Sequence, residues 1–374
     1  MMKRLESLDV LRGIDMFCLV AFGGFLGSLA QALGLDWLSG QLEHARWEGF
    51  TIQDIIMPLF MFCCGVAIPY AFAKYRTPGS GVSHGQAYWR IARRFVVLWI
   101  LGMIYQGNLL SLEPRWFKWY SNTLQAIAVG YAVSAIIYLN CRPRTQGIVA
   151  AVLLTAYWIL MSFVHVDGFG LSCEPVTNLC QWVDRMVLGS HRDFVFIADN
   201  GSWAFDDEYT YTWVLSSLNF VVTVLSGVFA GEILSSGRPE HRKLSALFTV
   251  GAIMIAAGLL WSLDMPIVKH IWTSSMTLFS SGICFVLMAV CYYVIDVKGW
   301  RKAGAWALPF GMNAIFAYMV IYFVDFNWIA GRFVGGLRQY MTPQWYQVIL
   351  NATACMIIYG LMYFLYKRKI FIKV

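Results

Sequence analysis

Long uncharged stretches alternate with short polar connections along nearly the whole chain. Ten runs of at least 18 residues contain no Asp, Glu, Lys, Arg or His: 16–35, 55–73, 95–112, 119–141, 145–164, 209–231, 244–263, 271–295, 303–324 and 339–366. A helix of about 20 residues crosses the roughly 30 Å hydrocarbon layer of a bilayer. The pattern therefore predicts an all-α, polytopic membrane protein with about ten transmembrane helices in a single transmembrane domain, residues 1–374.

Composition and charge support this class and suggest an orientation. Hydrophobic residues make up 59% of the chain and charged residues 13%, far from the balance of a soluble domain. If both termini are cytoplasmic, 20 of the 28 Lys and Arg residues fall in inner segments and 15 of the 21 carboxylates in outer ones. Basic residues favour cytoplasmic loops. This bias predicts an N-in, C-in topology, and it explains the net charge of +7 by contact with the bilayer, without a nucleic-acid partner.

Candidate chemistry lies where the first outer connection enters the second run. In EHARWEGFTIQDIIMPLFMFCCG, which starts at Glu43, the residues His44, Trp47 and Asp54 precede an uncharged stretch. If the helix begins near Thr51, Asp54 lies in its first turn, where the helix dipole favours a carboxylate. An ionisable residue at the end of a spanning helix indicates a functional site, because dehydrating it is costly. The alternative is that His44 and Trp47 only anchor the helix at headgroup depth.

Polar residues at the ends of other runs suggest further contacts. Arg12, Arg93 and Arg94 lie where the first and third runs begin on the cytoplasmic side, and guanidinium groups suit phosphate. Asn122 and Gln125 lie near the outer end of the fourth run. Such amides either join helices or bind a ligand. The arginines have a similar alternative as membrane anchors.

The segment 165–208 is the longest polar stretch and the only candidate for a subdomain outside the membrane. It contains eight carboxylates and two arginines. A long loop without repeats in a compact chain is usually functional or ordered over a site. Cys173 and Cys180 fall in this exoplasmic loop, where an oxidising compartment permits a disulfide; the sequence leaves that bond open.

Several motifs occur in an order that resembles a known family. They are SLDVLRG (7–13), HARWEGFTIQDIIMPLFMF (44–62), TLQAIAVGY, TVLSGVFAG, KHIWTSSMTLFSSG and PFGMNAIFAY. With these motifs the chain resembles the heparan-α-glucosaminide N-acetyltransferase family of transmembrane acyltransferases, and most of all its bacterial NagX-type members. The resemblance implies a transmembrane acyltransferase fold in a bacterial inner membrane. It also implies transfer of acetyl from cytoplasmic acetyl-CoA to the amine of glucosamine, or of a short glucosamine-containing saccharide, on the periplasmic side.

The resemblance also implies roles for individual residues. The family's catalytic histidine matches His44, and its following Trp, Thr and Asp match Trp47, Thr51 and Asp54. The expected site comprises the catalytic residues His44 and Asp54, the substrate contacts Trp47, Glu48, Gln125 and Trp272, and the acetyl-CoA contacts Arg12, Arg93, Arg94, Asn122, Ser275 and Asn313, with no metal. Two positions depart from the family pattern: Ala21 stands where many members have asparagine, and Ala126 where an arginine often follows the glutamine.

The chemistry of such a transfer agrees with a histidine at this place. A glucosamine amine must lose a proton before it attacks a thioester, and the ordinary pKa of histidine suits a general base. A ternary complex is the expected mechanism, and a ping-pong route through acetyl-His44 is the alternative. Two other functions remain open: an amino-sugar transporter and an O-acyltransferase of an envelope glycan. The sequence also leaves the oligomeric state open, a homodimer included.

Overall fold

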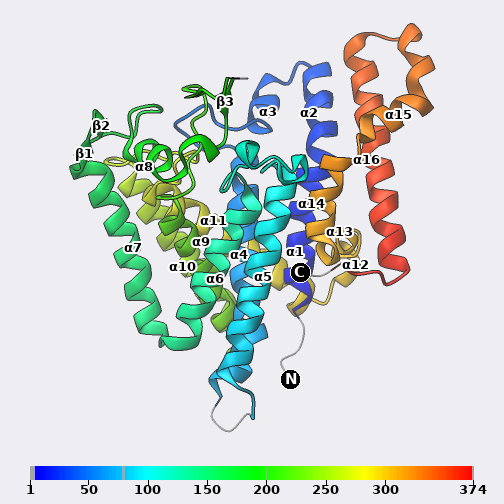
Figure 1. Ribbon diagram of the computed structural model, residues 1–374. Helices are drawn as coiled ribbons and strands as arrows, with labels where there is room; N and C mark the ends of the chain where they lie inside the picture. Colours follow the sequence, from blue (N-terminus) through cyan, green and yellow to red (C-terminus); the bar gives the residue numbers. More distant parts are fainter. Residues whose placement is uncertain (1–4, 78–80, 199, 373–374) are drawn as a thin grey trace.

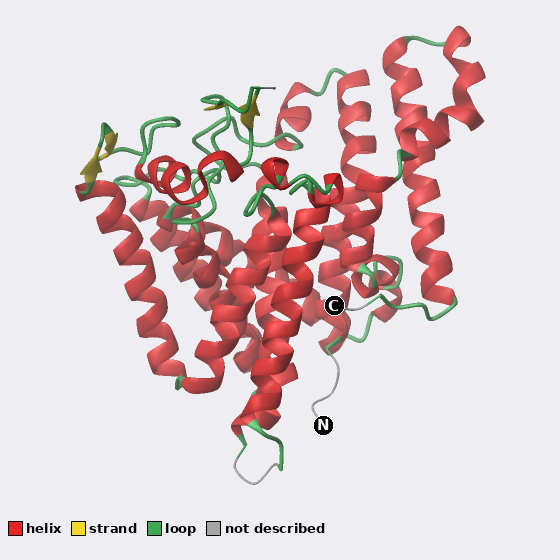
Figure 2. Ribbon diagram, in the orientation of Figure 1, coloured by secondary structure: helices red, strands yellow, loops and turns green. Residues whose placement is uncertain are grey.

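Long helices stand side by side in a bundle, and two hairpins lie with several of the short helices at one end of it (Figures 1 and 2). The computed structural model describes residues 5–77, 81–198 and 200–372. Backbone polar groups find no partner in hydrocarbon, so an uncharged run of this length satisfies them internally as a helix.

The long helices are α1 (Glu6–Phe17), which continues through the π-helical η1 (Cys18–Phe22) into α2 (Gly23–Ala32), then α4 (Ile56–Arg76), α5 (His84–Tyr105), α6 (Thr123–Asn140), α7 (Pro143–Phe163), α9 (Ser217–Ser235), α10 (Glu240–Trp261), α11 (Ser274–Cys291) with the π-helical η6 (Tyr292–Val297), and α16 (Pro343–Lys367). The shorter helices are α3 (Asp36–Gln41), η2 (Ile52–Ile55), η3 (Leu109–Ser111), η4 (Pro114–Trp116), α8 (Leu179–Leu188), η5 (Gly189–His191), α12 (Arg301–Gly304), α13 (Leu308–Met312), α14 (Ala314–Phe323), α15 (Phe326–Val334) and η7 (Gly335–Tyr340). The two antiparallel hairpins pair β1 (His165–Val166) with β2 (Phe169–Gly170), and β3 (Val195–Ile197) with β4 (Trp203–Phe205).

The prediction of an all-α, polytopic membrane protein is confirmed. Within the described ranges, eight helices are long and apolar enough to cross a membrane, and nine if α14 and the helix after it count as one span broken by a 69° bend. The helix α5 has 22 residues but carries Arg90, Arg93 and Arg94 in its first half. The predicted number of ten is therefore reached if α5 and the broken pair both cross the bilayer.

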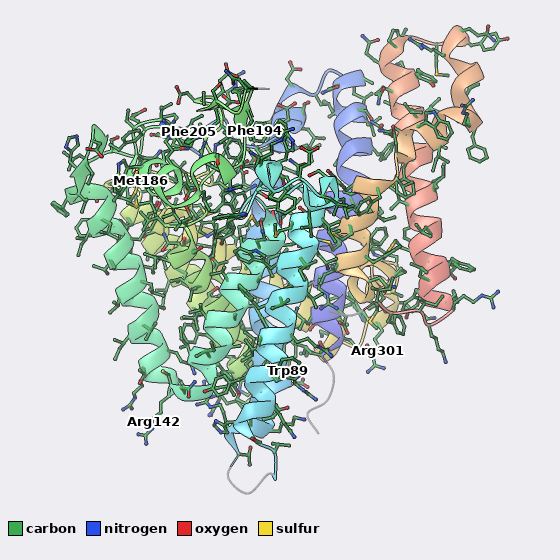
Figure 3. The ribbon with its side chains drawn as sticks, viewed as in Figure 1. Trp89, Arg142, Met186, Phe194, Phe205 and Arg301 are labelled. Atoms are coloured by element: carbon green, nitrogen blue, oxygen red, sulfur yellow. The ribbon has the colours of Figure 1, made fainter. Side chains whose placement is uncertain are left out.

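The connections between the long helices lie at the two ends of the bundle. Arg142 and Arg301 lie at the lower end in Figure 3, while Met186 and Phe205 lie at the upper end. The helix α1 begins at the lower end and α16 finishes there (Figure 1). The predicted cytoplasmic segments thus share one end, as an N-in, C-in topology requires. Which end faces the cytoplasm stays a prediction from the charge bias.

Close contact between α4 and α9 depends on two glycines. A Cβ atom on Gly227 would collide with the carbonyl oxygen of Phe62, and one on Gly65 would collide with that of Val224. Small residues at facing positions let two helices approach closely where lipid supplies no hydrophobic drive. This contact brings α4, which follows the candidate histidine, against the middle of the bundle.

The loop 165–208 forms an ordered layer at the upper end (Figure 1). Asp184 of α8 accepts hydrogen bonds from the backbone N–H groups of Trp213 (2.8 Å) and Val214 (2.9 Å), which ties this layer to the start of α9. Cys173 and Cys180 are both free thiols, so the disulfide that the sequence left open is not formed. The thiol of Cys180 instead lies 3.2 Å from the hydroxyl of Tyr157.

Candidate active site

His44 and Asp54 meet at the upper end of α4. Thr51 caps η2, which leads directly into α4, and Asp54 lies in this first turn as the sequence predicted. The Nδ1 atom of His44 is 2.8 Å from Oδ1 of Asp54. The carboxylate is 1% exposed, whereas the imidazole side chain is 43% exposed. The pair therefore combines a fixed, buried carboxylate with a histidine that a ligand can reach.

Hydrogen-bond donors surround the second oxygen of Asp54. Its Oδ2 accepts the backbone N–H groups of Thr51 (3.0 Å) and Ala45 (3.2 Å), and the Thr51 hydroxyl is also 3.0 Å away. The contact with Ala45 holds the residue next to His44. Because Oδ2 is filled by these donors, Oδ1 is left to interact with His44.

Lys269 completes the cluster from a segment more than 200 residues away. Its Nζ lies 3.2 Å from Oδ1 of Asp54 and 3.0 Å from Nδ1 of His44. The side chain is 7% exposed, and burial lowers the pKa of Lys269 while Asp54 acts in the opposite direction. The two segments are joined by backbone contacts, a bridge between Glu48 and Val268 and a hydrogen bond from Gly49 N–H to the carbonyl of Ile267 (2.9 Å).

His270 lies beside this cluster among aromatic rings. Its Nδ1 is 2.6 Å from the hydroxyl of Thr210, and its ring stacks on Tyr211 at 4.1 Å and meets the edge of Trp47 at 5.4 Å. Burial, and then the positive charge of Lys269, lower the pKa of His270 to about 4. His270 is therefore neutral near pH 7 and serves as a rigid wall of the site.

A cavity of about 440 Å³ extends from His44 into the bundle. The upper residues that line it are His44, Gln106, Phe194, Tyr209, Tyr211, Lys269 and His270, and the deeper ones include Met16, Leu19, Phe60, Ile127 and Ile315. Its volume lies within the range of small-molecule sites, which are mostly apolar with a few placed polar groups. Among the described residues that line it, none is a carboxylate.

Three of the predicted substrate and acetyl-CoA contacts lie in or beside this cavity. Trp272 lines it, with its indole N–H donating to the hydroxyl of Thr223 (3.1 Å). Asn122 also lines it, but its amide caps α6 and donates to a carbonyl of α5. Trp47 packs on His270, and its N–H donates to the Cys173 carbonyl (3.0 Å). Glu48 is exposed and pairs with Val268 through its backbone.

Three other predicted contacts serve the structure elsewhere. Gln125 is fully buried and bonds the backbone of Ser121 and Trp119. Ser275 donates to the Pro266 carbonyl (3.0 Å). Asn313 breaks the helix between α13 and α14 and bonds the backbone of residues 370 and 372. Gln125, Ser275 and Asn313 are not among the described residues that line the cavity.

The three arginines lie on α1 and α5 in different surroundings. Arg12 donates to the carbonyl of Gly311 and pairs with Asp9. Arg94 lies over the ring of Tyr131 at 4.4 Å, with one Nη 3.4 Å from the sulfur of Cys64. Arg93 is exposed. None of the three lines the cavity over the described part of the chain, and Arg12 and Arg94 contact different partners.

Ala21 and Ala126, the two residues that differ from the family pattern, are both buried. Ala126 is fully buried in α6, so an arginine there would require its neighbours to repack. Ala21 is 7% exposed and lies in the π-helical turn η1. Over the described residues, no group of three or more His, Cys, Asp or Glu side chains is placed to hold a metal ion.

Sequence reasoning missed Lys269 and His270 as site residues. In the motif KHIWTSSMTLFSSG, site roles are expected for Trp272 and Ser275 but not for Lys269 or His270. The signal was nevertheless present, because an adjacent Lys and His directly before an uncharged run repeat the feature that singled out His44. What the sequence could not supply was the pairing of these two distant connections.

Comparison with known proteins agrees with the resemblance seen in the motifs. No protein-family model matches the chain. The human heparan-alpha-glucosaminide N-acetyltransferase is 25% identical over 422 aligned residues, which cover 99% of this chain and 60% of the human protein. The mouse heparan-alpha-glucosaminide N-acetyltransferase is 23% identical over 426 residues, which cover 100% of this chain and 61% of the mouse protein. The chain is thus similar to these enzymes throughout, but it spans about 60% of their length.

Proposed function

We propose that this protein is a transmembrane N-acetyltransferase that moves the acetyl group of acetyl-CoA to the amine of glucosamine or a short glucosamine-containing saccharide. One observation carries the proposal: a half-exposed histidine, backed by a buried carboxylate, lines a cavity that extends into the membrane-spanning bundle. The similarity to two N-acetyltransferases supports the same reaction.

His44 acts as the general base of this reaction. With Nδ1–H donated to Asp54, the lone pair of Nε2 accepts a proton from the acceptor amine. The amine nitrogen then forms a bond to the acetyl carbon, and the carbon–sulfur bond of the thioester breaks. The proton held by His44 passes to the departing thiolate, which leaves as free CoA. The ammonium form of glucosamine first loses one proton to solvent. His44 then takes the second proton from the neutral amine as its nitrogen attacks the acetyl carbon.

The acceptor binds at the upper part of the cavity and the acetyl donor enters from the opposite end. Tyr211 and His270 offer stacked rings beside His44, and Gln106 adds an amide. Aromatic faces suit the apolar face of a sugar ring. Trp272 and Asn122 line the same cavity near the upper ends of α11 and α6. Arg93, with Arg12 and Arg94 on the same side of the bundle, would attract the CoA phosphates.

Orientation and location form part of the same proposal. Arg142 and Arg301, two of the predicted cytoplasmic basic residues, lie at the lower end (Figure 3), which supports entry of acetyl-CoA from the cytoplasm. The upper end then faces the periplasm of a bacterium, with the protein in the inner membrane. A small acceptor of the kind used by NagX-type proteins suits a cavity of about 440 Å³.

The decisive experiment measures acetyl transfer by the purified protein in detergent. Radiolabelled acetyl-CoA and free glucosamine are supplied to the wild type, to His44→Ala and to His165→Ala, which alters an exposed histidine of β1 at the same end. We expect labelled N-acetylglucosamine from the wild type and from His165→Ala but not from His44→Ala. Binding of glucosamine without any product would favour a transporter, and an ester product would favour an O-acyltransferase.

A second assay distinguishes direct transfer from a ping-pong route. Wild-type protein is mixed with labelled acetyl-CoA in the absence of sugar, then denatured rapidly and digested. Direct transfer in a ternary complex predicts no label on the peptide that contains His44. Stable label on that peptide, lost when glucosamine is added before denaturation, would establish an acetyl-enzyme intermediate.

A further inference from the structure

Lys269 is a buried lysine beside the proposed base, and the acetyl-transfer chemistry gives it no role. It is one of the residues that line the cavity, and its Nζ lies between Asp54 and His44. A buried ammonium costs several kcal/mol unless a partner compensates it. Its position next to the histidine therefore indicates that it has a function there.

The backbone around Lys269 is built to hold the side chain in place. The N–H of Trp272 donates to the Lys269 carbonyl (3.1 Å), and the N–H of Thr273 donates to the Val268 carbonyl (3.2 Å). Trp272 closes this turn with a φ of +52°, a left-handed conformation that large side chains rarely adopt. Such strain persists where surrounding contacts impose it, and it gathers at functional sites.

The proton positions follow from the three distances. An ionised Asp54 cannot donate, so the 2.8 Å contact requires Nδ1–H of His44 to donate to Oδ1. Lys269 then has no acceptor at Nδ1, and its bond goes to Oδ1 as well. The Oδ1 atom thus receives both donors, and His44 keeps the free lone pair of Nε2.

Lys269 and His44 are the two groups on Oδ1 of Asp54 that can carry the positive charge opposite this carboxylate. Among the described residues, the titratable groups that interact with His44 include Asp54 of η2 and Lys269 and His270 of the turn before α11, and Tyr211 of the connection before α9 lines the same cavity. His270 and Tyr211 are neutral near pH 7, because burial lowers the pKa of His270 to about 4 and raises that of Tyr211 to about 12. If Lys269 were neutral, His44 would be the remaining cation opposite the buried carboxylate.

We propose that Lys269 is a positioning residue that supplies the positive charge opposite Asp54, so that His44 remains neutral and its Nε2 can accept a proton. Removal of that charge would draw a proton onto His44, and an imidazolium cannot act as a base. The inference deepens the proposed acetyl transfer and rests on it for its catalytic meaning, but the protonation state itself can be measured without activity.

The first test compares pH–rate profiles for Lys269→Met and Lys269→Arg. The matched control is Lys118→Met, which removes another buried lysine at the same end, whose Nζ donates to the Ser190 carbonyl (3.3 Å). We expect the acidic limb of the kcat profile to move to higher pH by about one unit or more in Lys269→Met, about a tenfold loss of rate per unit. KM should change little. Lys269→Arg and Lys118→Met should keep the wild-type limb.

The second test reports on His44 directly. Diethyl pyrocarbonate reacts with neutral imidazole, so mass spectrometry of the His44 peptide after brief treatment across pH 5–9 measures its protonation. Half-maximal modification should occur at higher pH in Lys269→Met than in the wild type and Lys118→Met. Lys269→Gln, which keeps a donor toward Asp54, replaces Lys269→Met if the latter does not fold.

The outcomes separate this inference from the proposed function. An unchanged modification profile in the neutral variants overturns the role of Lys269, even if the wild type transfers acetyl. A modification profile that shifts to higher pH supports the role of Lys269. If the wild type also makes no N-acetylglucosamine, the effect of Lys269 on His44 remains supported while acetyl transfer is rejected. A lower rate without any shift in pH dependence would show that Lys269 acts only in packing.

Discussion

A few polar side chains at the upper end of the bundle form the candidate active site of this protein. Asp54 is held by Thr51, Ala45, His44 and Lys269, so each of its oxygens has at least two donors within 3.2 Å. A carboxylate so enclosed has little freedom to rotate. The hydrogen bond between Nδ1 and Asp54 restrains the ring of His44, while Nε2 stays accessible.

Replacing Asp54 by asparagine tests how far the histidine depends on the carboxylate. We expect Asp54→Asn to lower kcat by about 100-fold or more, since general-base catalysis contributes about that much and an amide cannot compensate Lys269. Asp325→Asn is the control, because it changes an exposed cap of α15, where Asn and Asp are equivalent. Kinetics with glucosamine and acetyl-CoA, at equal thermal stability, check the result. A kcat near that of the wild type would remove Asp54 from the mechanism.

His270 makes the stability of the protein sensitive to acid. Its pKa of about 4 lies below its ordinary value of 6.5, so between these values the unfolded chain binds a proton that the folded protein excludes. Stability therefore falls as the pH falls through this window. We expect the Tm of the wild type to drop more between pH 7 and pH 5 than that of His270→Gln.

The comparison between the two proteins isolates His270. Burial raises the pKa of both Asp184 and Asp193 to about 6, above the ordinary value of 3.8, so their protonation favours the folded state as the pH falls. This opposite effect is common to the wild type and the variant. Equal drops in Tm in both proteins would show that folded His270 accepts a proton.

The helices place these residues through their ends and their contacts. The turn at Thr51 sets Asp54 at the top of α4, and the turn at Trp272 sets Lys269 above α11. Both helices pack on α9, which fixes the two turns relative to each other. Contact between α4 and α9 at Gly65 and Gly227 therefore helps to support the candidate active site, although it lies within the bundle.

Substitution of Gly227 by alanine should weaken this support. We expect Gly227→Ala to destabilise the protein by about 1–3 kcal/mol, because its methyl group would overlap the Phe62 carbonyl. Gly360→Ala is the matched control: Gly360 lies in α16, and a Cβ there meets nothing within 4 Å. Thermal unfolding in detergent compares the two. A Gly227→Ala variant as stable as Gly360→Ala would mean that α4 and α9 can move apart at little cost.

The whole molecule separates two polar ends by a hydrophobic bundle. The cavity starts at the upper end, among the loop 165–208 and the turns that carry His44 and Lys269, and continues between α1, α4, α6 and α14. Such an arrangement suits a reaction whose two substrates arrive from opposite sides. That interpretation depends on the orientation of the chain in the membrane.

Labelling of single introduced cysteines tests the orientation. Met186→Cys lies at the upper end and Arg142→Cys at the lower end (Figure 3). In right-side-out vesicles we expect a membrane-impermeant maleimide to label position 186 directly and position 142 only after the membrane is opened. Site-resolved mass spectrometry separates these sites from the nine native cysteines. The reverse pattern would invert the topology and with it the proposed path of acetyl-CoA.

Much of the architecture follows from the sequence alone, because hydrophobicity is a local property. Uncharged runs set the spanning helices, the basic connections set the expected orientation, and Thr51 with Asp54 marks the start of α4. The candidate base could be chosen for the same reason, since an ionisable residue at the end of such a run is costly without a purpose.

Only the tertiary structure decided which polar residues lie together. Lys269 joins His44 and Asp54 because a backbone bridge aligns two connections more than 200 residues apart, and no local pattern encodes such a pairing. The same holds for Gln125, Ser275 and Asn313, whose amides and hydroxyl looked available for ligands but bond the backbone. Hydrophobic periodicity determines where a segment lies relative to the bilayer, whereas the neighbour of a buried polar group depends on how the helices pack.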